Sequence, residues 1–140
     1  MSFSESISPL IGRWLLAWFF LSSAYERASD WDATLTLMSM SHISFAPPLL
    51  AAALLVMVLG GLSLLVGFQT RHGAMLLFAF TAITTVLMNA YWTFSDAVQR
   101  ASEYDIFARN VAIAGGLLLL VGMGPGKFAV DNRGQGGRRR

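Results

Sequence analysis

The sequence predicts an all-α fold, an integral membrane four-helix bundle with both termini on the same side of the bilayer. Two observations lead to this prediction. Of the 140 residues, 55% are hydrophobic and only 13% are charged, and the mean hydropathy is +0.57, which is more apolar surface than a soluble domain of this size can bury. In addition, the segment from Ala46 to Arg71 carries no charge before its last residue, and about 20 apolar helical residues are enough to cross a bilayer.

Four segments are long and apolar enough to span. The first begins near Ser8 and Pro9, and the second opens with Pro47 and Pro48, because serine and proline are favoured where helices begin. The segment between these two spans is too short and polar to cross, so we expect a short helix at the interface or folded back on the bundle. The predicted spans are residues 8–25, 46–68, 73–92 and 105–123, with the interfacial segment at 28–45. Together they form a membrane domain of residues 1–126, followed by a basic, Gly- and Arg-rich tail, 127–140, that is expected to be disordered.

Lysine and arginine residues are distributed unequally between the two predicted faces. The face that holds both termini carries the larger set: Arg13, Arg71, Lys127, Arg133 and Arg138 to Arg140. The opposite face carries Arg27, Arg100 and Arg109. Cytoplasmic loops are enriched in Lys and Arg, so both termini are predicted to be cytoplasmic.

One short pattern occurs twice. Residues 60–67 read Gly-Gly-Leu-Ser-Leu-Leu-Val-Gly, and residues 115–122 read Gly-Gly-Leu-Leu-Leu-Leu-Val-Gly. The match indicates either a duplicated hairpin, which gives a 2+2 parallel repeat, or a coincidence between spans rich in Gly and Leu, and both interpretations stay open. Small residues let membrane helices approach closely. The predicted packing residues are Gly60, Gly61, Ser63, Gly67, Ala112, Gly115 and Gly116.

Polar residues gather where the four spans reach the face opposite the termini. We call this set the predicted mouth; it consists of Glu26, Asn89, Tyr91, Trp92, Arg109 and Asn110. One interpretation is a shallow ligand site in which a quinone carbonyl or a lipid headgroup accepts hydrogen bonds. The other is an ordinary interfacial rim with an aromatic belt. Because Arg109 lies a turn inside its span, it needs a specific partner, and Glu26 is the candidate.

Other chemistries find little support. The chain has no cysteine, which excludes disulfides, iron–sulfur clusters and zinc–thiolate sites. The two histidines, His42 and His72, fall on opposite membrane faces, so they cannot share a haem or a metal ion. No catalytic residue and no metal ligand set is predicted, and the dispersed basic residues give no reason to expect nucleic acid as a partner.

Several motifs occur in a recognisable order along nearly the whole chain. They are Arg13-Trp-Leu-Leu-Ala, Phe20-Leu-Ser-Ser-Ala-Tyr-Glu-Arg27, the Gly60 octet with Thr70-Arg71, Asn89-Ala-Tyr-Trp92, Arg109-Asn-Val-Ala-Ile-Ala-Gly-Gly116, Gly124-Pro-Gly-Lys127 and Asp131. In this order the chain resembles the DoxX/DoxD family of small four-helix bacterial membrane proteins. Two positions depart from that family's pattern: Met57 stands where a glutamate is common, and Asn89 stands where a histidine is frequent.

The resemblance implies a location in the bacterial cytoplasmic (inner) membrane and a role beside other subunits. The expected function is that of a non-catalytic subunit of a respiratory or quinone-linked oxidoreductase complex, giving anchorage and one wall of a quinone or lipid site. Quinone is the only cofactor this implies, and it is not held by covalent or metal bonds. The alternative is a stand-alone membrane protein that binds or transports a quinone or lipid.

Overall fold

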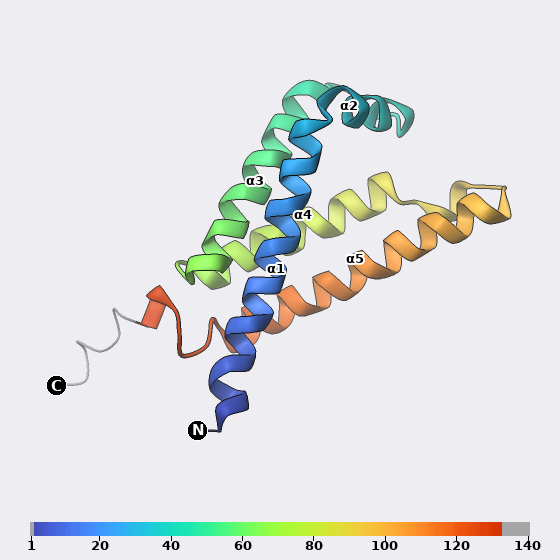
Figure 1. Ribbon diagram of the computed structural model, residues 1–140. Helices are drawn as coiled ribbons and strands as arrows, with labels where there is room; N and C mark the ends of the chain where they lie inside the picture. The colour runs from blue at the N-terminus through green and yellow to red at the C-terminus, as the bar shows by residue number, and fades with distance from the viewer. Residues whose placement is uncertain (1, 133–140) are drawn as a thin grey trace.

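The computed structural model describes residues 2–132, and all of its regular secondary structure over that range is helical. Its elements are α1 (Phe3–Ser29), α2 (Trp31–Met40), α3 (Ala46–Val66), α4 (Thr70–Met88), η1 (Tyr91–Thr93), α5 (Ala97–Met123) and η2 (Val130–Asn132) (Figure 1). Four stretches are long and apolar enough to cross a membrane: α1, α3, α4 extended through η1, and α5. The predicted fold class, an all-α membrane bundle with four long apolar helices, is therefore confirmed.

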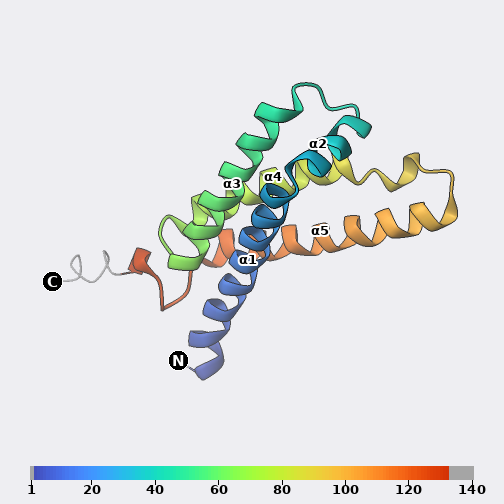
Figure 2. The same ribbon diagram turned by 45° about the horizontal axis from the view of Figure 1, so that its top comes forward.

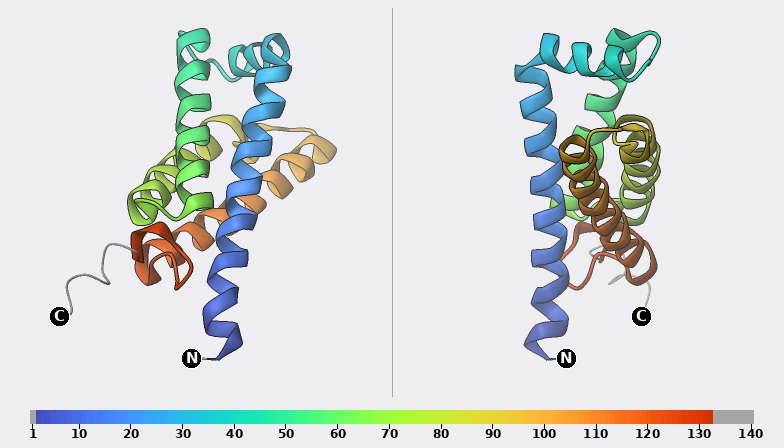
Figure 3. Two further views of the ribbon diagram at one scale, coloured as in Figure 1. Left: turned by 60° about the vertical axis from the view of Figure 1, so that its left-hand side comes forward. Right: turned by 90° about the vertical axis from the view of Figure 1, so that its right-hand side faces the viewer.

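The helices form two antiparallel pairs, α1 with α3 and α4 with α5. The pairs are joined mainly where α3 packs against α4, while α5 touches α1 only lightly. They lie close at one end and diverge toward the other, as two further views confirm (Figures 2 and 3). At the close end, α1 and α4 begin and α3 and α5 stop. We call it the strap end, after the segment that follows α5 there, and we call the opposite end the far end.

The two outer helices are longer than the predicted spans. Helix α1 begins at Phe3 instead of Ser8, because Ser2 and Glu5 form a reciprocal capping box, and Pro9 lies inside the helix. Helix α5 begins at Ala97 instead of residue 105, with the Asp96 side chain accepting a hydrogen bond from Val98 N. The predicted spans mark only the apolar part of each helix, because a hydropathy pattern gives no sign when polar residues continue a helix beyond the hydrocarbon.

The segment between α1 and α3 contains the short helix α2. Thr34 and Met38 are its buried residues, and it packs against both α3 and α1. Helix α3 then starts with the two prolines in its first turn, as predicted. This short helix therefore folds back onto the first helix pair.

Glycines set the close packing around α3. A Cβ atom built on Gly60 would lie 2.6 Å from the Leu77 side chain of α4, and one on Gly61 would lie 2.9 Å from Leu21 of α1. At the equivalent positions of α5 the contacts differ: a Cβ on Gly115 meets nothing within 4 Å, and one on Gly116 reaches Leu16 only at 3.8 Å. The close approach predicted for both octets therefore occurs only in α3, because α3 lies between two helices and α5 lies at the edge.

The buried core follows from this arrangement. It includes Ala17 and Phe20 of α1, Leu64 of α3, Leu77 of α4 and Leu117 of α5, each at most 1% exposed. Of the predicted packing residues, Ser63 is half-buried, Gly67 is buried and Ala112 is exposed. The core is thus concentrated along α1, α3 and α4.

Candidate functional site

The predicted mouth does not form one site. Asn89, at the end of α4, donates from Nδ2 to Glu103 Oε2 of α5 at 2.9 Å. Tyr91 lies edge-to-face against Trp92, Tyr104 and Phe107, with ring centroids 5.0–5.3 Å apart. These residues belong to the tip of the α4–α5 pair, which the divergence of the two pairs separates from the far end of α1 (Figure 1).

Arg109 is the mouth residue that reaches across to α1, but its partner is not Glu26. Its guanidinium carbon lies 5.8 Å from the centroid of the Phe19 ring, a cation–π arrangement. Within residues 2–132 it forms no ion pair with Glu26, whose charge acts instead on the neighbouring Arg27. Asn110 is half-buried one position further along α5. The expected Glu26–Arg109 pair is therefore wrong.

A more connected polar arrangement lies at the strap end, in the segment that follows α5. We call residues 124–131 the strap. Gly124 and Gly126 adopt φ values of +81° and +84°, which turn the chain back toward α1. A Cβ on Gly126 would lie 2.7 Å from Cβ of Pro9, so glycine is needed for the close approach. The first residues of the expected disordered tail are therefore docked on the bundle, while residues 133–140 lie outside the described range.

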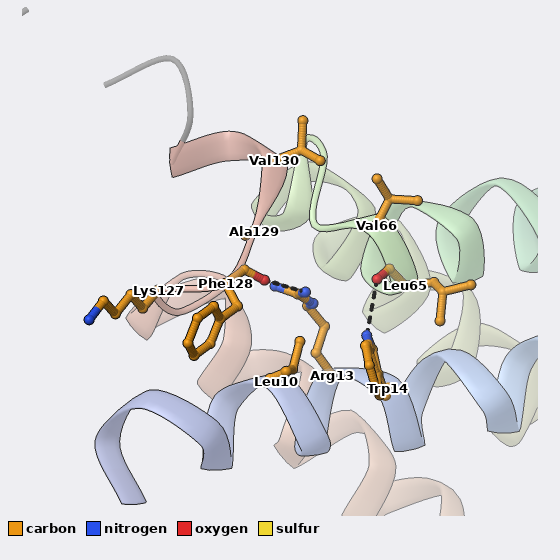
Figure 4. A pocket seen from close by; sticks show the side chains of 9 residues that line it. All are labelled: Leu10, Arg13, Trp14, Leu65, Val66, Lys127, Phe128, Ala129 and Val130. Carbon is orange, nitrogen blue, oxygen red and sulfur yellow. Dashed lines mark hydrogen bonds between the residues drawn. The ribbon is translucent and has the colours of Figure 1, made fainter. Parts of the chain in front are cut away.

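Arg13 holds the strap from the side of α1. Its side chain is only 2% exposed. Nη1 donates to the Pro125 carbonyl at 2.8 Å. Nη2 donates to the Phe128 carbonyl at 2.7 Å, as Figure 4 shows. Its Nε is buried and has no hydrogen-bond partner among the residues that the structure describes. The Arg13 guanidinium is thus enclosed by protein.

Asp131 holds the strap from the side of α4. Its two carboxylate oxygens accept hydrogen bonds from Gln69 N at 2.7 Å and Thr70 N at 2.9 Å, and its own amide donates to the Gly67 carbonyl at 2.9 Å. The carboxylate therefore caps the first turn of α4, where the helix dipole favours negative charge. Burial acts to raise the pKa of Asp131, but the two amide hydrogen bonds and the charge of Arg13 outweigh it, so this pKa lies below its usual range.

Two cavities flank the strap. The smaller, of about 460 Å³, is mostly apolar and is shown in Figure 4. It is lined by Leu10, Arg13, Trp14, Leu65, Val66, Lys127, Phe128, Ala129 and Val130. Trp14 crosses its floor and donates from Nε1 to the Leu65 carbonyl at 3.2 Å. The strap forms one wall of this cavity.

The larger cavity, about 1330 Å³, is an open cleft between α1, the start of α4, the end of α5 and the strap. Its apolar wall comes from Leu15, Leu16, Leu119, Leu120 and Met123. Its polar rim includes the basic residues Arg71 and Lys127, His72, and the acidic residues Glu5 and Asp131. Arg13 lines both cavities. None of the six mouth residues lines either cavity.

The chemistry of the strap end is that of an anion site. It offers guanidinium groups, an imidazole and backbone N–H groups at a helix start, which are the donors that phosphate and carboxylate groups use in proteins. Among the described residues, no three His, Cys, Asp or Glu side chains come together as a metal site would require. In the sequence, the one signal for this site is an aspartate within an otherwise basic segment that follows Gly-Pro-Gly.

Comparison with known proteins gives a consistent family. The family model of the SURF4 family matches residues 9–135. The chain is 30% identical over 128 residues to inner membrane protein YqjF of Escherichia coli (strain K12), covering 91% of this chain and 92% of that protein. It is 32% identical over 127 residues to inner membrane protein YphA of the same organism, covering 89% of this chain and 88% of the relative.

A longer relative matches along a similar stretch. The chain is 30% identical over 129 residues to a Surfeit locus protein 4 homolog of Schizosaccharomyces pombe, covering 89% of this chain but only 36% of that protein. No solved structure matches. The expected resemblance to the DoxX/DoxD family is therefore wrong, since both the family model and the relatives point to SURF4.

Proposed function

The chain belongs to the SURF4 family, and from this premise we propose that it is a non-catalytic membrane protein that binds an anionic phospholipid in the open cleft at the strap end. The coarser part of this description is secure: four apolar helices can cross a bilayer, and relatives of similar length are named inner membrane proteins. The ligand and its site are the proposal. The earlier expectation of a quinone-linked respiratory subunit depended on the DoxX/DoxD resemblance and loses its support with it.

The observation that carries the proposal is the joining, in one cleft, of an apolar wall to a charged rim on which Arg13, Arg71 and Lys127 outnumber two carboxylates. Leu15 and Leu119 are 61% and 65% exposed on helices that can span the bilayer, so an acyl chain can lie against them. At the rim, Arg71 makes no hydrogen bond or ion pair with another described residue. The guanidinium of Arg71 therefore has donors that a phosphate group can use, and His72 also lines the rim.

The position of the cleft favours a phospholipid over a free anion. Basic pockets between membrane helices recognise anionic headgroups, with each cation near the surface contributing about 1 kcal/mol. The rim also belongs to the end that the distribution of Lys and Arg predicts to be cytoplasmic, where anionic lipids give the leaflet a negative potential. The acyl wall then adds apolar contacts that inorganic phosphate cannot make.

The test compares lipid binding by two arginine variants. The protein is reconstituted in nanodiscs of phosphatidylcholine with increasing phosphatidylglycerol, and bound lipid is counted by native mass spectrometry. The Arg71→Gln variant is expected to bind phosphatidylglycerol about fivefold more weakly. Arg100→Gln removes the same charge from an exposed position at the far end and is the matched control.

Three results would contradict the proposal. The first is equal affinity for the two lipids in the wild-type protein. The second is an equal loss of affinity in Arg71→Gln and Arg100→Gln, which would indicate a diffuse charge effect. The third is full competition by inorganic phosphate at low millimolar concentration, which would indicate an anion site that takes no lipid.

For the predicted mouth we propose an anchoring role. The aromatic cluster of Tyr91, Trp92, Tyr104 and Phe107 lies at the tip of the α4–α5 pair, and Trp92 and Tyr104 are about half exposed. Amphipathic rings of this kind favour the membrane–water interface. Replacing Trp92 by Ala is then expected to leave phosphatidylglycerol binding at the cleft unchanged in the same native mass spectrometry assay.

A further inference from the structure

Asp131 occupies a site that is built for an anion. We propose that the strap is an internal substitute for the ligand. Asp131 and the strap carbonyls accept hydrogen bonds from the same donors that bind the phosphate of an anionic lipid, and lipid binding displaces the strap. This inference rests on the proposed lipid-binding function, which it deepens by naming the competing group and the moving segment.

The first support is the seat of the Asp131 carboxylate. Two consecutive backbone amides, Gln69 N and Thr70 N, donate to its two oxygens at the start of a 19-residue helix. This is the geometry in which helix N-termini hold phosphate groups. Asp131 also lines the open cleft, so a headgroup that enters the cleft meets the carboxylate at these donors.

The second support is the state of Arg13. The side chain is almost fully buried, yet its hydrogen bonds go to two neutral carbonyls, and within residues 2–132 it forms no ion pair. Nε has no described partner at all. Guanidinium groups bind phosphate more strongly than they bind carbonyls, because the hydrogen bonds are charge-assisted and bidentate. A phosphate in place of the strap therefore satisfies Arg13 better than the strap does.

The third support is the place of the strap between the two cavities. Lys127 and the buried Arg13 line both cavities, while Phe128 and Val130 wall only the smaller one. When the strap moves away, the apolar cavity beside Trp14 and Leu65 and the basic cleft become one site. Such a site has room for an acyl chain at one end and a headgroup at the other.

The strap is held mainly by polar contacts. Phe128 is 51% exposed and Val130 is 37% exposed, while Gly126 and Ala129 pack closely on Pro9 and Gly67. Its attachment depends mainly on hydrogen bonds to Arg13 and to the α3–α4 turn. A phosphate group can accept hydrogen bonds from the same donors, so its binding replaces the hydrogen bonds that displacement of the strap removes.

The first experiment removes the competing charge. Asp131→Asn keeps an acceptor oxygen but loses the negative charge, so phosphatidylglycerol binding in the nanodisc assay is expected to tighten about two- to fivefold. The matched control is Asp96→Asn, which makes the same change at the N-cap of α5 at the far end. Unchanged or weaker binding by Asp131→Asn, or an equal gain in Asp96→Asn, overturns the competition.

The second experiment observes the strap itself. Because the chain has no cysteine, Phe128→Cys gives a single site for a nitroxide spin label. In phosphatidylcholine nanodiscs the label is expected to be immobile in the wild-type background and mobile in the Asp131→Asn background. Phosphatidylglycerol is expected to make the wild-type label mobile. A label that stays immobile with bound phosphatidylglycerol overturns the displacement.

The two proposals fail differently. If neither the wild-type protein nor Asp131→Asn binds phosphatidylglycerol selectively, the lipid-binding function fails. If the spin label also stays immobile in Asp131→Asn, the role of Asp131 in holding the strap fails as well. If wild-type protein binds the lipid with Asp131→Asn unchanged, the function stands and the strap inference fails. If selective binding appears only in Asp131→Asn, the wild-type protein does not bind the lipid, so the proposed function fails and the displacement of the strap by lipid fails with it.

Discussion

Arg13 donates a hydrogen bond from Nη1 to the carbonyl of Pro125, 112 positions further along the chain, at 2.8 Å. A second bond, to the Phe128 carbonyl, makes the guanidinium a clip between the first spanning helix and the segment after the last one. Helices α1 and α5 otherwise touch only lightly. The clip therefore adds a second connection between the two helix pairs at the strap end, beside the contact of α3 with α4.

Replacing Arg13 by Lys is expected to destabilise the protein. Lysine keeps the charge, but its single ammonium cannot serve both carbonyls with the planar geometry of a guanidinium. The loss of at least one buried hydrogen bond costs about 1–3 kcal/mol of unfolding free energy, measured by denaturation in mild detergent. Arg100→Lys, at an exposed position, is the control, and equal stability of the two variants would contradict the clip.

The two glycine-rich octets are expected to respond oppositely to alanine. Gly60→Ala places a methyl group against Leu77 in the close contact between α3 and α4, and overpacking of this kind costs about 1–3 kcal/mol. Gly115→Ala meets open space and gains helix propensity, so it is neutral or stabilises by up to about 1 kcal/mol. Thermal unfolding in detergent measures both, and equal losses would show that α5 has a close neighbour at Gly115.

Removing a buried hydroxyl from α4 is expected to stabilise the bundle. Thr81 and Thr85 are 5% and 4% exposed, and their hydroxyls have no hydrogen-bond partner in the described part of the chain. Replacing Thr85 by Val removes an unpaired polar group at nearly constant shape, which gains about 1 kcal/mol. Thr84 differs because its hydroxyl donates to the Phe80 carbonyl at 2.8 Å. Thr84→Val is therefore the control and is expected to show no gain in the same unfolding assay.

Acid is expected to loosen the strap. The pKa of Asp131 is lowered in the folded protein, so its carboxylate stabilises docking above the unfolded pKa of about 3.9, and this stabilisation is lost as the pH falls through the folded value. The mobility of a spin label at Phe128→Cys should then rise below about pH 4. The same label in an Asp131→Asn background should lose this dependence, and an unchanged acid transition there would assign the effect to another group.

Much of the fold follows from the physics of the bilayer. The length of apolar runs identifies the four long helices, and Pro47 and Pro48 mark the start of α3, because hydrocarbon thickness and proline geometry act locally. The start of α5 was missed because polar residues such as Asp96 and Arg100 continue a helix outside the apolar run. The close similarity of the two octets does not show that α3 is central and α5 is at the edge. The close packing expected at Gly115 was wrong for this reason.

The candidate site depends on relations that no local pattern contains. Arg13 and Asp131 come together because the chain turns at Gly124 and Gly126. The residues near Arg13 in the sequence do not indicate that the carbonyls of Pro125 and Phe128 accept its hydrogen bonds. The polar residues of the predicted mouth are on the expected helices, but the divergence of the two pairs separates the tip of the α4–α5 pair from the far end of α1. The family assignment failed for a related reason: short Gly-, Leu- and Trp-containing motifs reflect what membrane helices need in order to pack and anchor.

The clip at Arg13 has a consequence for biosynthesis. Its guanidinium enters the membrane with the first helix, but the carbonyls of Pro125 and Phe128 that receive its hydrogen bonds are synthesised after the last one. Until those residues emerge, the guanidinium of the nascent protein lacks its two carbonyl acceptors and depends on water or lipid headgroups for hydrogen bonds. Residues after the last helix thus supply the acceptors for Arg13 of the first helix. A chain that terminates before Pro125 lacks these two hydrogen bonds and differs from the finished protein in this respect.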